Sequence, residues 1–357
     1  MPTIQSLRVR PIIVPMPEPH RTASGVVASS PLVLVDVTTS DGTVGHGLVF
    51  TYTPAALKPT AELITNFAPL ITGDAVNAQA VTDKMLSRMR LLGPHGLVGI
   101  AIAAIDMAVA DAEARLAGKP LYALLGAQRR TTPCYGGIGF DGAAQCAKVA
   151  ERWAKVGMRG VKAKIGYPTV EEDIEVIRAM RAAIGPDIAI MVDYNQCLTV
   201  EQAIDRIGRL EAENVTWVEE PTIAEDYAGH ARIAAAVRTP IQAGENWWGP
   251  REFEKAIAAK ATDLLMPDVM KGFGVTGWMR IAKMAAAHNL PASSHLWPEV
   301  SAQLLAATPT AQWLEYADWW NPVMREPLTL KDGLAVPSDR PGSGVEWNEK
   351  AVAEFAH

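Results

Sequence analysis

The sequence predicts a two-part α/β protein, in which an α+β region precedes a parallel α/β barrel. The chain has 357 residues, roughly the length of two domains, and its 49% hydrophobic content is enough for a large core. From about residue 132 onward, short apolar runs alternate repeatedly with helical stretches. Because repeated strand–helix units fold into parallel strands surrounded by helices, this pattern indicates a barrel.

The region before residue 132 has the signals of a small sheet with helices. Residues 32–38 are rich in β-branched side chains, and residues 44–50 continue as a second strand after the strong hairpin turn Asp41-Gly42. Helical periodicity then predicts two helices, at residues 55–72 and 97–117.

The barrel strands are predicted where the later apolar runs lie. The eight runs are residues 134–138, 160–165, 188–194, 215–219, 241–244, 264–266, 290–293 and 313–316. The intervening stretches, such as residues 170–184, are amphipathic with helical spacing. The tail after Asn321 contains short strand-like pieces, and we expect it to return to the first region.

The composition excludes several classes of protein. A formal net charge of −6 argues against a nucleic-acid or anionic-membrane surface, because both need clustered Lys and Arg. The three cysteines cannot all pair and have no CxxC spacing, which indicates a reducing compartment. The sequence has no signal-peptide pattern and no apolar run of membrane-spanning length. We therefore predict a cytoplasmic protein.

Three carboxylates stand where successive barrel strands end: Asp193, Glu219 and Glu245. The carboxyl ends of barrel strands meet at one mouth, so these side chains should lie close together. Carboxylates that close repel one another unless a cation lies between them. All-oxygen ligands favour a hard cation, and Mg2+ is the simplest choice. Each residue alone could be an ordinary loop charge, but three in register favour a metal site.

A lysine pair, Lys162 and Lys164, ends the second predicted strand. Residues two apart on a strand point to the same face. Neighbouring ammonium groups lower each other's pKa, which can leave one lysine neutral and able to act as a base. The alternative is an ordinary surface strand, although the apolar neighbours Val161 and Ile165 indicate burial of the other face.

An aspartate and a histidine, Asp268 and His295, stand at the ends of the sixth and seventh predicted strands. Asp268 ends the sixth run and His295 follows the seventh, and an Asp beside a His fixes the imidazole tautomer and raises its basicity. The alternative is a satisfied core histidine. Glu315, on the eighth run, could be a protonated acid that donates to a developing oxyanion, or an ordinary barrel-end carboxylate. Lys164 and His295 would face a substrate from opposite sides.

Two glycine-rich segments, residues 137–142 and 272–277, match the dinucleotide-binding pattern GxGxxG. Neither has the acidic residue expected about 20 positions later, so a nicotinamide enzyme is a weak alternative.

Taken together, these motifs resemble the mandelate racemase/muconate lactonizing enzyme family of the enolase superfamily over nearly the full chain. The resemblance is carried by Lys162-Ala163-Lys164, Met191-Val192-Asp193-Tyr194-Asn195, Glu219-Glu220-Pro221, Gly244-Glu245-Asn246, Met266-Pro267-Asp268, Ser293-Ser294-His295 and Trp313-Leu314-Glu315. It implies a modified TIM barrel, (β/α)7β, over residues 126–320 and an α+β capping domain over residues 1–125. Residues 321–357 are implied to return to the cap.

The same resemblance implies the roles of the site residues. Lys164 resembles the base for one enantiomer, and His295, paired with Asp268, resembles the base for the other. Lys162 resembles the lysine that contacts the substrate carboxylate, and Glu315 resembles the acid that hydrogen-bonds the enediolate. The implied cofactor is Mg2+, held by Asp193, Glu219 and Glu245.

The resemblance also predicts where the substrate lies. The predicted substrate-binding residues are Asn195, His20, Arg21, Phe50, Tyr52, Leu91 and Leu296. A lid at residues 18–27 carries His20, Arg21 and Ser24 where the family's lid is apolar. A 2-hydroxy acid with a polar or anionic distal group is therefore favoured over mandelate.

The predicted function is Mg2+-dependent removal of the proton alpha to a carboxylate, through an enediolate, most simply as racemisation of a 2-hydroxy acid. The nearest alternative is an acid-sugar dehydratase that uses the same Lys and His–Asp bases. A non-catalytic barrel that binds carboxylates is the alternative from another class. The expected partners are a 2-hydroxy acid or sugar acid and further copies of the chain, because the family is commonly octameric.

Overall fold

The computed structural model describes residues 2–22 and 25–357, and its first part is a three-stranded antiparallel sheet with helices. The strands, in spatial order, are β1 (Ile4–Thr22), β2 (Gly25–Thr39) and β3 (Val44–Phe50). The helices are α1 (Pro54–Ile71), α2 (Ala78–Arg88), α3 (Leu97–Leu116) and the short α4 (Leu121–Leu124). The two strands and two helices predicted here are present, and β1, α2 and α4 are additions.

Two glycines let α3 lie directly against β3. A Cβ at Gly45 would come within 2.2 Å of the carbonyl oxygen of Ala108, and one at Gly47 within 2.5 Å of that of Ala104. Any larger residue would push the helix away from the sheet. α3 is buried almost all round, which makes it the centre of this part of the molecule.

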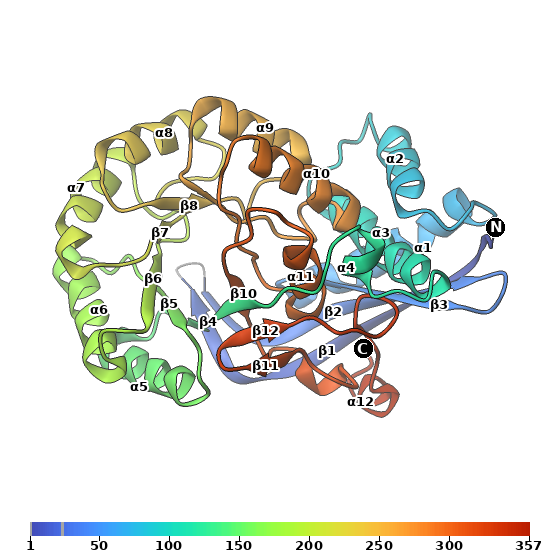
Figure 1. Ribbon diagram of the computed structural model, residues 1–357, viewed down its shortest axis with the longest axis horizontal. Helices are drawn as coiled ribbons and strands as arrows, with labels where there is room; N and C mark the ends of the chain where they lie inside the picture. The colour runs from blue at the N-terminus through green and yellow to red at the C-terminus, as the bar shows by residue number, and fades with distance from the viewer. Residues whose placement is uncertain (1, 23–24) are drawn as a thin grey trace.

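The second part is a parallel barrel surrounded by helices (Figure 1). Neighbouring strands pair in parallel from β4 to β9, and β10 pairs with β4, which closes the barrel. The strands are β4 (Thr132–Ile138), β5 (Gly160–Lys164), β6 (Ala189–Asp193), β7 (Val218–Glu219), β8 (Ile241–Ala243), β9 (Leu264–Leu265) and β10 (Leu314–Tyr316). The helices are α5 (Gly142–Lys155), α6 (Val170–Ile184), α7 (Val200–Leu210), α8 (Tyr227–Ala236), α9 (Gly249–Ala259), α10 (Gly274–Ala287) and α11 (Pro298–Ala306), with the 3-10 turn η1 (Glu211–Glu213).

The seventh predicted strand, residues 290–293, is the exception. This segment forms only single bridges, Leu265↔Ala292 and Ala292↔Ala311, in place of a regular strand. Pro291 has no N–H to donate, which interrupts regular pairing at this point. The bridge Asp268↔His295 follows, so the segment still brings the predicted histidine beside the predicted acid.

The C-terminal segment contacts both parts of the molecule. Its elements are η2 (Asn321–Val323), β11 (Thr329–Lys331), β12 (Leu334–Val336) and α12 (Glu349–Glu354). β12 pairs antiparallel with β4 of the barrel. Beyond it, Nε1 of Trp347 donates to Oδ1 of Asp36 on β2 at 2.7 Å, and Ala356 bridges to Ile12 on β1. Figure 1 shows this red segment returning to the blue sheet.

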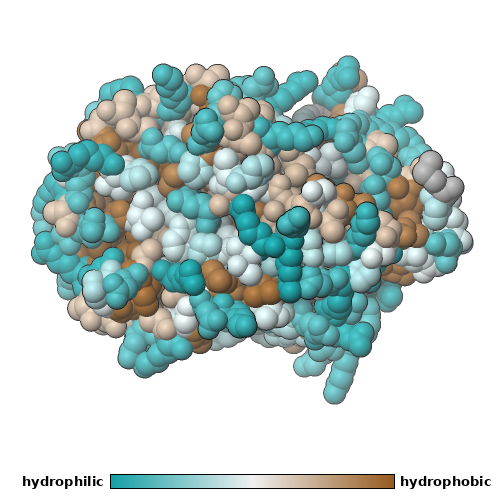
Figure 2. Space-filling view, in the orientation of Figure 1, coloured by the Kyte–Doolittle hydropathy of each residue, from teal (hydrophilic) through white to brown (hydrophobic). Residues whose placement is uncertain are grey.

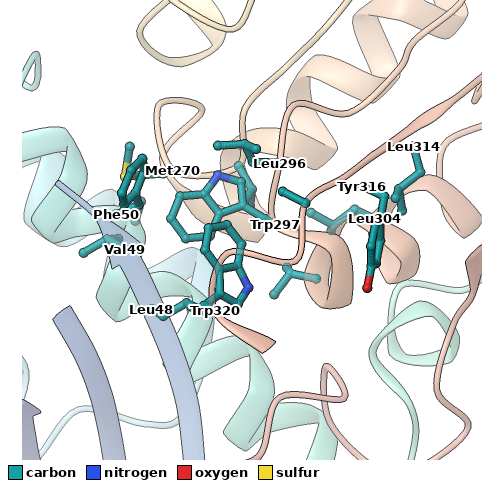
Figure 3. Packing of buried hydrophobic residues seen from close by; sticks show 14 of the residues in the cluster. Leu48, Val49, Phe50, Met270, Leu296, Trp297, Leu304, Leu314, Tyr316 and Trp320 are labelled. Atoms are coloured by element: carbon teal, nitrogen blue, oxygen red, sulfur yellow. The ribbon is translucent and has the colours of Figure 1, made fainter. Parts of the chain in front are cut away.

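An aromatic layer joins the first sheet to the barrel (Figure 3). The rings of Trp297 and Trp320 stack with centroids 5.2 Å apart, and Phe50 on β3 lies 6.4 Å from Trp320. Met270 and Leu296 are buried beside them. Large aromatic groups remove much apolar area from water, so this layer holds the sheet over the end of the barrel that carries His295.

Exposed hydrophobic residues on the face shown in Figure 2 form scattered groups among hydrophilic ones. Within residues 2–22 and 25–357, no helix combines the length and the apolar character needed to cross a membrane.

Candidate active site

Three carboxylates converge at the mouth of the barrel. Asp193 ends β6, Glu219 ends β7, and Glu245 lies two residues after β8. One oxygen atom of each lies within 4.8 Å of the others, and all three side chains are buried. Oε2 of Glu245 has no hydrogen-bond partner among the described residues. Buried carboxylates this close, with one oxygen that accepts no hydrogen bond, fit a hard divalent cation such as Mg2+.

Lys162 and Lys164 project from β5 to one face, where each contacts a carboxylate. Nζ of Lys162 contacts Glu219 and lies 3.0 Å from Oε1 of Glu315, and Lys164 contacts Asp193. Burial is the largest influence on the pKa of Lys164 and lowers it, as does the charge of Lys162, but Asp193 together with Glu245 and Glu219 outweighs them and the pKa is raised. The lowering of the Lys164 pKa by Lys162, which the sequence predicted, is therefore present but is not the dominant influence. A cation on Asp193 would weaken the influence that raises this pKa.

His295 forms the expected pair with Asp268. Nδ1 of His295 lies 2.6 Å from Oδ2 of Asp268, which also accepts from Nε1 of Trp297 at 3.0 Å. Two backbone N–H groups of the next turn donate to Oδ1 at 2.7 and 3.0 Å, so the carboxylate cannot rotate freely. Nε2 of His295 lies 3.3 Å from Oε2 of Glu245. Burial disfavours the imidazolium, but Glu245 and Asp268 outweigh it and raise the pKa of His295.

Glu315 lies on β10 between the lysine pair and the histidine. Its Oε2 accepts from the backbone N–H of Leu296 at 3.1 Å and lies 3.8 Å from Nε2 of His295. Burial favours the neutral acid, but Lys162 and His295 outweigh it and hold the pKa of Glu315 below its ordinary value. The protonated carboxyl that the sequence suggested therefore stays a prediction for the substrate-bound site, because in this arrangement the two cationic neighbours favour the carboxylate.

Four of these side chains line one cavity of about 80 Å³. It is lined by both lysines, His295 and Glu315, together with two of the predicted substrate contacts, His20 and Leu296. Asp193, Glu219 and Glu245 are called the metal cluster below. Asn195 lies beside it, and its Nδ2 donates to Oδ2 of Asp193 at 3.1 Å.

The other predicted substrate contacts are not among the residues that line this cavity. Arg21 does not line the cavity itself, and its Nη1 lies 2.9 Å from Oδ1 of the lining residue Asp141. Phe50 is fully buried and packs on Tyr52, with ring centroids 4.7 Å apart. Leu91 is fully exposed in the loop after α2, so its assignment to the cavity is wrong for the single chain. Of the predicted lid, residues 23 and 24, including Ser24, lie outside the described residues.

The outer part of the cavity contains residues that sequence reasoning missed. Arg152 on α5 reaches the lid, where its Nη1 lies 3.0 Å from Oε2 of Glu18. Asp318 and Trp319 follow β10 and line the same space. Their position directly after a barrel strand was the available signal, whereas the length of the Arg152 side chain gave none.

A second missed group lies on the other side of the metal cluster. Glu220 is fully buried, accepts from Nδ2 of Asn246 at 2.7 Å, and leaves Oε1 without a partner among the described residues. Nζ of Lys271 contacts Oδ1 of Asn246 and lies 5.1 Å from the ring centroid of Tyr52. A lysine in the apolar turn after Asp268 was the signal for this network.

Comparisons with known proteins match both parts of the chain. Residues 5–126 match the family described as mandelate racemase / muconate lactonizing enzyme, N-terminal domain. Residues 145–351 match the family described as enolase C-terminal domain-like.

Individual relatives are similar over nearly the full length. L-talarate/galactarate dehydratase of Salmonella typhimurium is 36% identical, with 90% of this chain and 81% of the relative covered. The 3,6-anhydro-alpha-L-galactonate cycloisomerase of Streptomyces coelicolor is 31% identical, with 98% and 99% covered. The crystal structure of a Bradyrhizobium enolase complexed with magnesium and mandelic acid is 43% identical, with a TM-score of 0.94 and coverage of 100% and 99%.

Proposed function

The chain belongs to the mandelate racemase/muconate lactonizing enzyme family of the enolase superfamily, and from that premise we propose that it removes the proton next to the carboxylate of a hydroxy acid. The proposal is supported by one cavity in which the lysine pair, His295 and Glu315 face a common space. Asp193, Glu219 and Glu245 would hold Mg2+ at the edge of this space. The bound ion would stabilise the negative charge that develops on the substrate carboxylate.

Two bases then serve the two faces of the substrate. Lys164 takes the C2 proton from one side and His295 takes it from the other. Nδ1–H of His295 donates a hydrogen bond to Oδ2 of Asp268. Nε2 of the neutral imidazole therefore has the lone pair that receives a proton from the substrate. Lys162 pairs with the substrate carboxylate. Glu315 takes up a proton when substrate binds and donates it in a hydrogen bond to the oxygen on which charge develops.

The outcome depends on what C3 of the substrate carries. Return of a proton from the opposite base would give the C2 epimer, which is racemisation. If C3 carries a hydroxyl, a protonated base can give that hydroxyl a proton, water leaves, and the enol product becomes a 2-keto-3-deoxy acid. We favour this dehydration of a sugar acid, because His20 places a polar group in the cavity and an aryl substituent would leave it unpaired. Racemisation of a 2-hydroxy acid is the second candidate, favoured by the two bases lining one cavity.

The test is NMR of the Mg2+-loaded protein with sugar acids and short 2-hydroxy acids in D2O. We expect a 2-keto-3-deoxy acid from at least one sugar acid. EDTA should abolish its formation and Mg2+ should restore it, and the Lys164→Met/His295→Asn variant should form none. Deuterated C2 epimer as the sole product would favour the racemase. No C2 exchange with any acid would reject the proposal.

We further propose that the enzyme is a homo-oligomer, as the family resemblance implies, and that it is cytoplasmic, as its cysteine content suggests. Light scattering on the purified protein tests the assembly, with an octamer expected, and cell fractionation tests the location.

A further inference from the structure

The half of the cavity that lies away from the metal cluster has its own polar lining. It is built from the lid, the end of β4, the second half of α5 and the loop after β10. The polar residues there are Glu18, His20, Asp141, Arg152 and Asp318. None of these residues has a part in the proton transfer described above. Their chemistry therefore bears on which substituent the substrate carries at its far end.

Both arginines near this half are already paired. Arg152 lies 3.0 Å from a carboxylate oxygen of Glu18, and Arg21 lies 2.9 Å from one of Asp141. Asp318 adds a further negative charge. A second carboxylate on the substrate would thus meet neutralised arginines and an extra anion, and its loss of hydration would not be repaid by a free cation.

Unlike the two arginines, His20 is uncharged, and its ring nitrogens are available to bind a substrate group. Burial, followed by the charge of Lys164, lowers the pKa of His20 to about 3, so the imidazole is neutral near pH 7. No described residue forms a hydrogen bond with the ring, whose nearest aromatic partner is Trp319 at 5.1 Å between centroids. A neutral imidazole offers one donor and one acceptor, which match a hydroxyl group better than a carboxylate.

The cavity also has room for more atoms at this end. A Cβ placed on Gly137, at the end of β4, would have no neighbour within 4 Å. Ala317, directly after β10, likewise contributes only a methyl group to the lining. Small residues at both strand ends leave space for a polyhydroxy chain between the bases and His20.

We propose that the outer half of the cavity is a hydroxyl-binding subsite centred on His20, and that the enzyme prefers sugar acids with one carboxylate over the corresponding dicarboxylates. This inference rests on the proposed removal of the C2 proton and specifies the substrate class. It separates the chain from its 36% identical relative, whose name gives galactarate, a dicarboxylate, as a substrate.

The test uses matched pairs of C6 acids that differ only at C6, such as galactonate with galactarate and gluconate with glucarate. C2 proton exchange and product formation are measured by NMR with the Mg2+-loaded protein. We expect kcat/KM for the monocarboxylate to exceed that for its dicarboxylate partner by about tenfold or more, the size of effect typical when a buried polar group loses its partner. His20→Val should reduce this ratio about tenfold.

A reciprocal variant strengthens the test. Glu18→Gln frees the guanidinium of Arg152, so it should raise kcat/KM for the dicarboxylate several-fold and lower the preference. A dicarboxylate preference in the wild type, or a ratio unchanged by His20→Val, would overturn the inference while C2 exchange still supports the function. If no acid exchanges its C2 proton, the function fails, and calorimetric binding of the same pairs decides the inference: tighter dicarboxylate binding overturns it.

Discussion

Replacing Asp268 with Asn tests the assignment of His295 more sharply than removing the histidine does. Oδ1 of Asp268 accepts two backbone N–H groups, and Oδ2 accepts from Nδ1 of His295 at 2.6 Å and Nε1 of Trp297 at 3.0 Å. An amide has one acceptor oxygen and one NH2 donor. If that oxygen keeps the backbone bonds, the NH2 faces His295, and the imidazole must accept at Nδ1. Its proton then moves to Nε2, where the substrate proton should arrive.

An imidazole in this tautomer cannot act as the base. The same Asp-to-Asn change lowers kcat by about 10⁴-fold in the Ser-His-Asp triad, because the tautomer is wrong. We expect a loss of about 10³–10⁴ in proton removal from the C2 epimer served by His295. The epimer served by Lys164 should change by less than about tenfold, since Asp268 makes no contact with that lysine.

Deuterium incorporation at C2, followed by NMR for each epimer separately, measures this split. Trp297→Phe is the matched control, because it removes one hydrogen bond to Asp268 and leaves the carboxylate charged. It should leave exchange from both epimers within about tenfold of wild type. Equal losses for both epimers in Asp268→Asn, or no loss for either, would refute the assignment of the second base.

Three further perturbations test the metal cluster, the network of Glu220, Asn246 and Lys271, and the contact between the two parts of the chain, in which Oδ1 of Asp106 on α3 accepts from the backbone N–H of Thr276 on α10 at 3.1 Å. Glu219→Gln should weaken Mg2+ binding in calorimetry by at least about tenfold, because an anionic ligand is lost; unchanged affinity would contradict the metal assignment. Lys271→Met should cost about 1–3 kcal/mol in urea unfolding, because Oδ1 of Asn246 loses its donor, and the cost should be much smaller in an Asn246→Leu background; equal costs in the two backgrounds would show that the two residues act separately. Burial raises the pKa of Asp106 from 3.8 to about 6, so the folded protein binds a proton at Asp106 more tightly than the unfolded chain does. The free energy of unfolding gained in this way is fully present below about pH 4 and is lost as the pH rises through 6. The total loss is up to about 3 kcal/mol. Asp106→Asn should remove this slope in urea unfolding between pH 4 and 8, and an identical pH profile would contradict the shift.

The arrangement of the site was predictable because it follows from one rule of the fold. Parallel strands in a barrel end at the same mouth, so polar residues that follow apolar runs are brought together regardless of the helices between them. Asp193, Glu219 and Glu245 illustrate this, since each stands at a strand end and their oxygens meet within 4.8 Å. Even the irregular segment around Pro291 keeps His295 beside Asp268 through a single bridge.

The lid residues were harder to place because they depend on pairing that the sequence did not reveal. His20 and Arg21 are adjacent on β1, paired with Val27 and Val26 of β2, so they point to opposite faces of the hairpin. With β1 unpredicted, nothing in the sequence decided which of the two faces the cavity. Leu91 was misplaced for a related reason, because it lies in the loop that follows the unpredicted helix α2.

Charge states in the mouth were the least predictable feature, because each depends on the whole cluster. Lys162 alone would have lowered the pKa of Lys164, and burial alone would have kept Glu315 neutral, yet Asp193 reverses the first effect and two cations reverse the second. The balance follows from positions in space that the spacing of residues does not supply.

That balance also limits what the site can bind. The carboxylates gathered at the mouth are those of Asp193, Glu219, Glu220, Glu245, Asp268 and Glu315. They outnumber the ammonium groups of Lys162, Lys164 and Lys271 by three formal charges, which a divalent cation and a protonated His295 would offset. A substrate with one carboxylate then adds a single unbalanced charge, held by the metal and Lys162. A second carboxylate would add another charge on the side of the cavity where the arginines are already paired, so the same electrostatic balance that calls for a cation also favours a monocarboxylate substrate.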